Sequence, residues 1–183
     1  NPGLDMKKLS MQELGRPSAE AFSQQSKIPL VLVLDNIRSG LNVGSLFRTA
    51  DAFALEALYL CGITACPPHR EILKTALGST ETVSWTAFEN TTDALHDLRE
   101  KGFQIWALEQ STPRTWLNEF LMPQKNGVAL VLGNEVDGVD NEVLALCDGA
   151  LEIPQFGTKH SLNVAVAGGI ACWEMAKQWH QKD

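Results

Sequence analysis

The chain has 183 residues, of which 44% are hydrophobic and 20% are charged, a composition typical of one soluble globular domain with a substantial core. No apolar run approaches the roughly 20 residues of a membrane-spanning helix, which argues against a membrane partner. The net charge of −7 argues against a protein that holds nucleic acid through a uniformly basic surface.

Charge is unevenly distributed along the sequence. Residues 135–152 carry acidic side chains without a single Lys or Arg. Cationic residues elsewhere are far apart in sequence, and we expect the fold to bring them to one face. They are Arg38, Arg48, His69, Arg70, Lys74, Lys159 and His160.

The cysteines indicate a reducing environment. The chain has four, with no C-x-x-C spacing and mostly apolar neighbours: Cys61, Cys66, Cys147 and Cys172. We therefore expect reduced thiols, with neither a disulfide framework nor a zinc site. No signal-peptide pattern is present, so a cytoplasmic location is expected.

Residues 1–27 are polar and precede the first strong apolar run. An N-terminal extension is predicted here, with a flexible start and a short helix over residues 18–25. Its cations allow a second interpretation, in which the extension contacts nucleic acid. A single domain is predicted over residues 28–183.

Apolar runs and helical periods alternate from residue 29 onward. The continuous run 29–34 is typical of a strand buried on both faces, and helical spacing of apolar residues follows over 42–53. Further strands are predicted over 57–61, 81–88, 104–108, 128–132 and 150–153. Further helices are predicted over 69–77, 92–101, 142–147 and 162–178, with a brief helix after Pro113.

Local signals mark the ends of several helices. Asp140 is expected to cap the helix 142–147 and Gly149 to stop it. Ser161 is a candidate N-cap for the last helix. Glycine inside a helix costs stability, so Gly168 and Gly169 predict close backbone packing, against either the sheet or a second subunit.

Strands that alternate with helices predict an α/β fold, a mainly parallel sheet with helices on both faces. Periodicity alone favours an ordinary doubly wound sheet. The absence of G-x-G-x-x-G after the first strand argues mildly against a dinucleotide-binding fold.

Three motifs, each placed after a predicted strand, carry the functional signal: NVGSLFR over 42–48, LVLGNEVDG over 130–138 and IPQFGTKHSLNV over 153–164. In the third, a strand end, a polar loop and a helix start follow one another. Free backbone N–H groups at a helix start suit a polar or acidic ligand. An ordinary strand-to-helix loop is the alternative.

Together the three motifs resemble the signature motifs of the SpoU/TrmH branch of the SPOUT RNA methyltransferases. Their order and spacing agree, and the resemblance covers residues 28–183. It implies a SPOUT-type α/β fold whose C-terminal segment threads through a loop to form a trefoil knot.

The resemblance also implies a cofactor, S-adenosylmethionine, and no metal. By position, three loops would hold it, and much of the contact would come from backbone atoms. The residues are Leu108, Glu109, Leu132, Gly133, Asn134, Ile153, Pro154, Gln155, Ser161, Leu162 and Asn163.

The implied reaction transfers a methyl group to a ribose 2′-OH of tRNA or rRNA. The resemblance assigns the key role to Arg48. A guanidinium with a pKa above about 12 is a poor base, so two interpretations stay open. A nearby phosphate or carboxylate helps Arg48 lose its proton, or Arg48 stays charged and stabilises the developing alkoxide.

Supporting roles follow from the same motifs. Asn42 would help place Arg48, Glu135 would orient it, and Ser161 and Asn163 would add polar contacts; a solvated loop carboxylate is the alternative for Glu135. Ala165 departs from the pattern, since many relatives have serine there. The residues expected to contact RNA are Arg38, His69, Arg70 and Lys74.

Members of this family are homodimers that share the active site, so Arg48 would act on the neighbour's cofactor. Compact members more often act on tRNA, which is slightly favoured here. Two alternatives remain: a non-catalytic SPOUT protein that binds RNA, and an α/β enzyme that uses another nucleotide.

Overall fold

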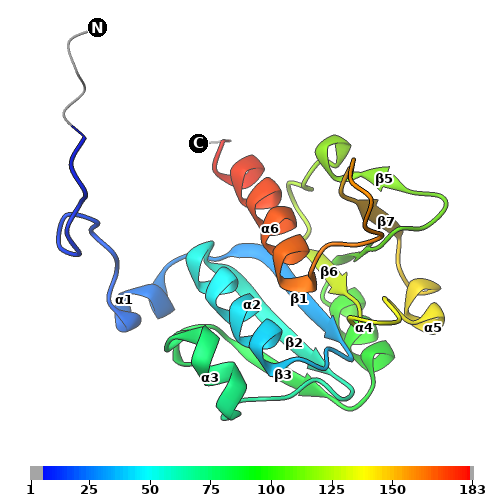
Figure 1. Cartoon of the computed structure of the whole chain (residues 1–183), viewed down its shortest axis with the longest axis horizontal. Helices are drawn as coiled ribbons and strands as arrows, with labels where there is room; N and C mark the ends of the chain where they lie inside the picture. The colour runs from blue at the N-terminus through cyan, green and yellow to red at the C-terminus, as the bar shows by residue number, and fades with distance from the viewer. Residues whose placement is uncertain (1–5, 182–183) are drawn as a thin grey trace, which may run out of the picture.

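The computed structural model describes residues 6–181. The expected flexible start of the chain lies outside these residues. Within them, a seven-stranded sheet in the order β3-β2-β1-β6-β4-β7-β5 forms the centre of the molecule, and every paired strand is parallel (Figure 1). The strands are β1 (Ile28–Asp35), β2 (Leu55–Cys61), β3 (Trp85–Phe88), β4 (Gln104–Leu108), β5 (Thr115–Trp116), β6 (Val128–Leu132) and β7 (Gly149–Glu152).

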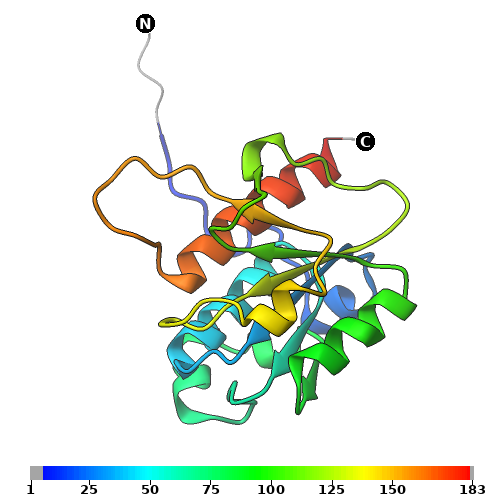
Figure 2. The same cartoon turned by 90° about the vertical axis from the view of Figure 1, so that its right-hand side faces the viewer.

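Helices cover both faces of the sheet (Figure 2), which confirms the predicted α/β fold. One apolar cluster joins β1 to α2, α3 and α6, and the other joins it to α4 and α5. The helices are α1 (Ala19–Gln24), α2 (Gly40–Ala52), α3 (Arg70–Ala76), α4 (Thr91–Glu100), α5 (Asn141–Leu144) and α6 (Val164–His180), with 3-10 turns over Ser79–Glu81 and Leu117–Glu119.

The central strand β1 shows why its sequence is continuously apolar. Leu30, Leu32 and Leu34 pack into the cluster under α2 and α6, while Val31 and Val33 pack into the cluster under α4. Successive side chains of a strand point to opposite faces, so a strand covered on both faces must be apolar throughout. The parallel strand pairs do not test the knotted path, which stays a prediction.

The last helix begins later than predicted, and its cap is a different residue. The side chain of Asn163 accepts hydrogen bonds from the N–H groups of Ala165 and Val166 at 2.9 and 3.2 Å. Asn163, and not Ser161, therefore satisfies the free N–H groups of the first turn. The helix α2 begins at Gly40, two residues earlier than predicted, because the side chain of Ser39 accepts a hydrogen bond from the N–H of Asn42.

Three predicted elements differ more clearly. The strand expected over 81–88 forms only from Trp85, because a 3-10 turn occupies Ser79–Glu81. The helix expected after Pro113 is a two-residue strand followed by a 3-10 turn. The helix α5 has one turn and ends before Gly149, which is instead the first residue of β7.

Gly149 has a packing role in place of the predicted helix stop. A Cβ at this position would lie 2.4 Å from the ring of Trp106 on the neighbouring strand. Asp148 fixes the same register, since its backbone N–H donates to the carbonyl of Ile105 and its side chain accepts from the N–H of Ile105, both at 2.7 Å. Strand pairing therefore ends α5 early.

The N-terminal part forms the predicted short helix, α1, with Ser18 as its cap. Figure 1 shows residues 6–17 extending away from the body of the molecule. Phe22 is buried, and the Lys27 ammonium donates to its carbonyl and lies over its ring. No helix among residues 6–181 is long and apolar enough to cross a membrane.

The four cysteines are free, as predicted. Burial raises the pKa of Cys61 and of Cys172 to about 12, so both thiols stay protonated at neutral pH. In the described part of the chain, no group of three or more His, Cys, Asp or Glu residues could hold a metal ion. A cytoplasmic location stays a prediction.

Candidate active site

A cavity of about 620 Å³ opens where β4, β6 and β7 end and α6 begins. This is the carboxyl edge of the parallel sheet, the usual ligand position in open α/β folds. The volume lies in the range of small-molecule sites. All predicted cofactor-binding residues except Pro154 line it: Leu108, Glu109, Leu132, Gly133, Asn134, Ile153, Gln155, Ser161, Leu162 and Asn163.

The loop that follows β6 folds back on itself. Asn134 and Gly138 exchange two backbone hydrogen bonds, at 2.9 and 3.0 Å, and the amide of Asn134 donates to the carbonyl of Asn36. A Cβ on Gly133 would lie 2.3 Å from the backbone of Gly138. Gly133 is therefore required by contact within the loop.

The loop after β4 is tied to both neighbouring loops. One carboxylate oxygen of Glu109 accepts from the N–H of Val139 at 3.0 Å, and the other accepts from the N–H of Gln110 at 2.8 Å. The amide of Gln110 donates to the carbonyl of His160 at 2.7 Å. These bonds hold the three cavity loops in one arrangement.

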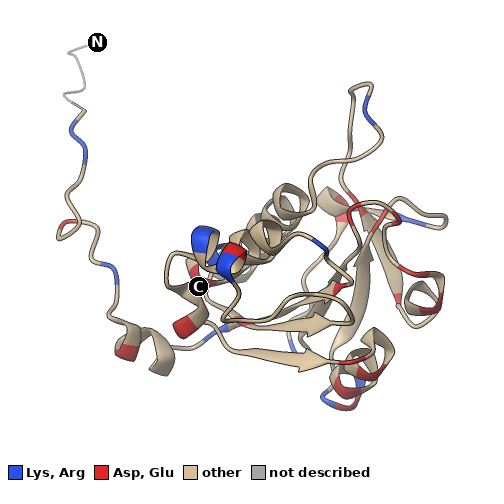
Figure 3. Ribbon diagram, turned by 60° about the horizontal axis from the view of Figure 1, so that its bottom comes forward, with Lys and Arg blue, Asp and Glu red and all other residues tan. Residues whose placement is uncertain are grey.

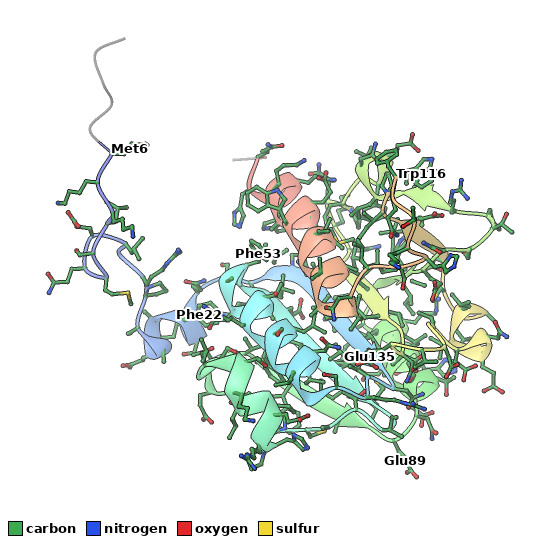
Figure 4. The ribbon with its side chains drawn as sticks, in the orientation of Figure 1. Met6, Phe22, Phe53, Glu89, Trp116 and Glu135 are labelled. Carbon is green, nitrogen blue, oxygen red and sulfur yellow. The ribbon has the colours of Figure 1, made fainter. Side chains whose placement is uncertain are left out.

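Glu135 joins the second motif to the start of α2 (Figure 4). Its carboxylate accepts from the backbone N–H groups of Arg38 and Ser39 at 2.9 and 3.0 Å, and from the amide of Asn42 at 3.1 Å. The oxygen of that Asn42 amide in turn accepts from the amide of Asn163 at 3.2 Å. Residues from all three motifs therefore form one hydrogen-bonded chain, which we call the Asn42–Glu135–Asn163 network.

The hydrogen bonds also determine the charge of Glu135. Partial burial raises the pKa of this carboxyl, but the donors from Arg38, Ser39 and Asn42 outweigh it, so the pKa falls below its usual value. Glu135 is thus an anion at neutral pH, placed where it accepts from the free N–H groups before α2.

Arg48 lies outside this network. Its side chain is exposed on α2, does not line the cavity and makes no hydrogen bond or ion pair with the residues described, 6–181. It follows Asn42 by six residues, about 9 Å along the helix axis. The expected orientation of Arg48 by Glu135 is absent within one chain, because Glu135 holds the start of α2 instead.

The residues expected to contact RNA surround the start of α2. Arg38 precedes the helix, and His69, which caps α3 by accepting from the N–H of Glu71, would contact a Cβ placed on Gly40 at 3.0 Å. Arg38, His69, Arg70 and Lys74 are all exposed. Figure 3 shows cationic positions on α3 and on the loop before α6, while acidic positions crowd around α4 and α5.

Sequence reasoning missed four polar residues of the cavity lining, Gln110, Asp137, Asn141 and Glu152, and two of them make contacts that shape the site. Gln110 ties two loops together, and Glu152 lines the cavity while its carboxylate pairs with Arg114 at 3.1 Å, without hydrogen-bond geometry. Arg114 also lies 4.2 Å over the ring of Trp116. Neither Gln110 nor Glu152 belongs to a motif. Gln110 follows β4 and Glu152 ends β7, and the pairing of these two strands brings both residues to the cavity.

The charged residues that line the cavity are all acidic: Glu109, Glu135, Asp137 and Glu152. Among residues 6–181, no Lys, Arg or His contributes to this lining. Such a site favours a ligand that carries positive charge, because unlike charges attract across a partly desolvated cavity. Apolar walls from Leu108, Leu132 and Ile153 complete a mixed polar and apolar pocket.

Comparison with known proteins adds a family. Residues 29–173 match the model of the SpoU rRNA Methylase family. The 23S rRNA (guanosine-2′-O-)-methyltransferase RlmB of Neisseria meningitidis is 33% identical over 159 residues, which cover 87% of this chain and 62% of that protein. RlmB of Vibrio parahaemolyticus is 30% identical, with 91% and 66% covered. The chain thus spans less than two thirds of the length of these relatives.

Solved structures give the same picture. The TrmH/SpoU tRNA modifying enzyme of A. aeolicus superposes with a TM-score of 0.78 at 28% identity, over 88% of this chain and 80% of that one. An rRNA methyltransferase of Sinorhizobium meliloti with bound AdoMet superposes with a TM-score of 0.76 at 28% identity, over 87% and 59%. The overall fold is therefore shared with these enzymes.

Proposed function

The chain belongs to the SpoU rRNA methylase family, and on that premise we propose that it transfers a methyl group from S-adenosylmethionine to a ribose 2′-OH of RNA. One observation carries the proposal: residues of the second and third motifs line one cavity, and the Asn42–Glu135–Asn163 network joins the first motif to them. The motifs lie far apart in sequence, so their convergence on one site supports a shared function.

The cavity fits the cofactor on chemical grounds. S-adenosylmethionine supplies an activated methyl group on a sulfonium, and it carries positive charge at the sulfur and at its amino group. The acidic lining described above suits those charges, and the walls formed by Leu108, Leu132 and Ile153 suit an adenine ring. The residues that line the cavity therefore fit S-adenosylmethionine.

Arg48 is assigned the role of a charged stabiliser. No carboxylate among the described residues pairs with it, so nothing in its own chain favours loss of its proton. A guanidinium keeps its charge at neutral pH. As the ribose oxygen takes the methyl group and its proton passes to water, Arg48 would stabilise the negative charge that develops on that oxygen, and the donor would leave as a neutral thioether. Alignment of the two reactants would lower the barrier further.

We further propose a homodimer that packs through α6. Four outward residues recur there at i, i+3, i+4 and i+7, the spacing of one helix face: Val166, Gly169, Ile170 and Trp173. Val166 and Trp173 are 52% and 58% exposed, and nothing lies within 4 Å of a Cβ placed on Gly169. A two-fold dimer would cover this apolar stripe with its own copy, and a partner would bring its Arg48 toward the cavity that Arg48 does not reach in its own chain.

The RNA class is open between two candidates. The curated relatives named above act on 23S rRNA, whereas the A. aeolicus enzyme modifies tRNA. The slight tRNA preference expected from the sequence rested on the compactness of the chain, and the relatives named above do not distinguish tRNA from rRNA. Both RNA classes therefore belong in the assay.

The test is methyl transfer from labelled S-adenosylmethionine to unmodified transcripts of 23S rRNA and of a tRNA pool, with mapping of the product nucleotide. We expect 2′-O-methylation at one position. Arg48→Ala is expected to lower the rate by at least about 100-fold, the effect of removing one charge stabiliser, with cofactor affinity retained.

Two results would overturn the proposal. Absence of S-adenosylmethionine binding in calorimetry would favour an enzyme that uses another nucleotide. Tight cofactor binding without transfer to either RNA would favour the non-catalytic RNA-binding alternative. Arg48→Lys is the matched control: it keeps the charge but not the planar fork, so partial activity supports a role in charge stabilisation.

A further inference from the structure

The loop between β7 and α6 presents an aromatic ring to solvent beside the cavity. Phe156 is 97% exposed. Two other residues of the same loop, Gln155 and Ser161, line the cavity. Figure 2 shows this loop standing out from the body of the molecule. The ring is therefore at the entrance of the site and makes little contact with its own chain.

The loop is anchored on both sides of the ring. At its far end, the carbonyl of His160 accepts from the amide of Gln110, and Asn163 caps α6 and donates to Asn42. At its near end, it continues directly from β7, which pairs with β4. An anchored loop can present a side chain at a defined place, which a free loop cannot do.

The loop is also positive in an acidic protein. Between Glu152 and Glu174 the sequence has no acidic residue, and Lys159 and His160 are both exposed. The loop on the other side of the cavity carries Glu135, Asp137 and Asp140. A polyanion that reaches the cavity is therefore attracted over the loop of Phe156 and repelled from the opposite loop.

We propose that Phe156 is a stacking platform for an unpaired base of the RNA substrate, next to the nucleotide whose ribose enters the cavity, and that Lys159 and His160 contact phosphates of the same strand. This inference rests on the proposed function for its choice of RNA. Proteins recognise single-stranded RNA by stacking bases on aromatic side chains beside cationic groups. A nucleotide that leaves its helical stack to reach an active site loses stacking, and the ring replaces part of it.

The experiment compares Phe156→Ala and Phe156→Trp with the parent chain. RNA affinity is measured by fluorescence anisotropy, with a labelled single-stranded oligoadenylate and with the 23S rRNA and tRNA transcripts. We expect Phe156→Ala to weaken binding roughly ten-fold, the effect of removing one base–aromatic stack. Phe156→Trp is expected to restore binding, and the added indole emission should be quenched when RNA is bound.

Leu121→Ala is the matched control. Leu121 is also a large exposed apolar residue, at 81%, but it lies beside Phe120 and Met122, which bond to Gln178 near the opposite end of α6. We expect RNA affinity to be unchanged in this variant. Lys159→Gln should reduce the salt dependence of RNA binding by somewhat less than one unit of slope, the value for one phosphate of a single strand.

Three results would overturn the inference. Unchanged RNA affinity in Phe156→Ala would show that Phe156 does not stack on a base of the RNA. If Phe156→Ala loses S-adenosylmethionine affinity in calorimetry, the ring contacts the cofactor. If Phe156→Ala sediments as a smaller species than the parent chain, the ring contacts a second copy of the chain. Because the binding assay requires no methyl transfer, an inactive chain that still binds RNA through Phe156 would refute the proposed function and leave this inference standing.

Discussion

At the scale of single residues, Glu135 shows how one carboxylate can organise a site. It accepts three hydrogen bonds from the segment that starts α2, at 2.9–3.1 Å. Charged hydrogen bonds of this kind are shorter and stronger than neutral ones. Glu135 thereby determines where Asn42 lies, and Asn42 contacts Asn163 of the third motif.

The lowered pKa of Glu135 predicts a pH dependence of stability. A carboxyl with a depressed folded-state pKa contributes stability that is fully present above its unfolded value, near 4.5, and is lost as the pH falls through the folded value. We expect Glu135→Gln to be less stable than the parent at about pH 6, with the difference shrinking below about pH 4. Urea unfolding of both chains across this range measures it; a difference independent of pH would contradict the ionic role.

At the scale of elements, the two faces of α6 differ in the room that they leave for a side chain at a glycine position. A Cβ on Gly168 would lie 2.7 Å from Leu46 on α2 and 3.1 Å from Leu132 on β6, whereas a Cβ on Gly169 meets nothing within 4 Å. Of the two expectations from sequence, packing within the chain applies to Gly168. Packing against a second subunit stays a prediction for Gly169.

Alanine at these two positions separates the two roles. Gly168→Ala is expected to lower the free energy of unfolding by about 1–3 kcal/mol through overpacking. Gly169→Ala is expected to raise it by up to about 1 kcal/mol in the monomer, because alanine favours helix more than glycine. Denaturant unfolding measures both. Equal destabilisation by the two substitutions would contradict the packing described here.

The cap of α6 is a second element whose role can be dissected. Asn163→Ala removes both the cap and the bond to Asn42, and we expect it to cost about 1 kcal/mol of stability. Asn163→Asp keeps an acceptor for the N–H groups of Ala165 and Val166 but loses the amide donor toward Asn42. Full stability with reduced methyl transfer in Asn163→Asp would support the network; full activity in both variants would refute it.

At the scale of the whole molecule, the main question is where Arg48 acts. The cavity lies at the end of β4, β6 and β7, while Arg48 is exposed on α2. Within residues 6–181, the Arg48 side chain does not contribute to the cavity lining. The apolar stripe on α6 offers a surface through which a second copy would supply the missing arginine. Trp173→Glu places a charge in that stripe and is expected to yield a monomer by sedimentation, with methyl transfer lost and cofactor binding retained.

Mixing inactive chains tests the shared site directly. Ala167 lines the cavity, so Ala167→Phe is expected to fill it and abolish cofactor binding. Neither Arg48→Ala nor Ala167→Phe should transfer methyl groups alone. If Arg48 serves the neighbouring cavity, a mixed dimer contains one complete site, and the mixture regains activity. A mixture that stays inactive, although mixed dimers form, would place Arg48 in the site of its own chain.

Local sequence patterns determined the main elements and the positions of the motifs. The strands 104–108 and 128–132 match their predicted bounds. The strand 128–132 is continuously apolar because it is buried on both faces of the sheet. The predicted cofactor residues line one cavity because the carboxyl ends of parallel strands share an edge. The family followed from three short motifs, since each combines a strand end with a particular set of polar residues.

Only the tertiary structure decided which groups meet. Glu135 binds the N–H of Ser39 across 96 positions of sequence, and no local pattern distinguishes that partner from the expected Arg48. Gly149 leaves room for the ring of Trp106, and Gly168 leaves room for Leu46. Such close contacts depend on how the elements pack against each other. Propensity and periodicity describe each element by itself, whereas hydrogen-bond partners and crowding depend on the distances that folding creates between elements.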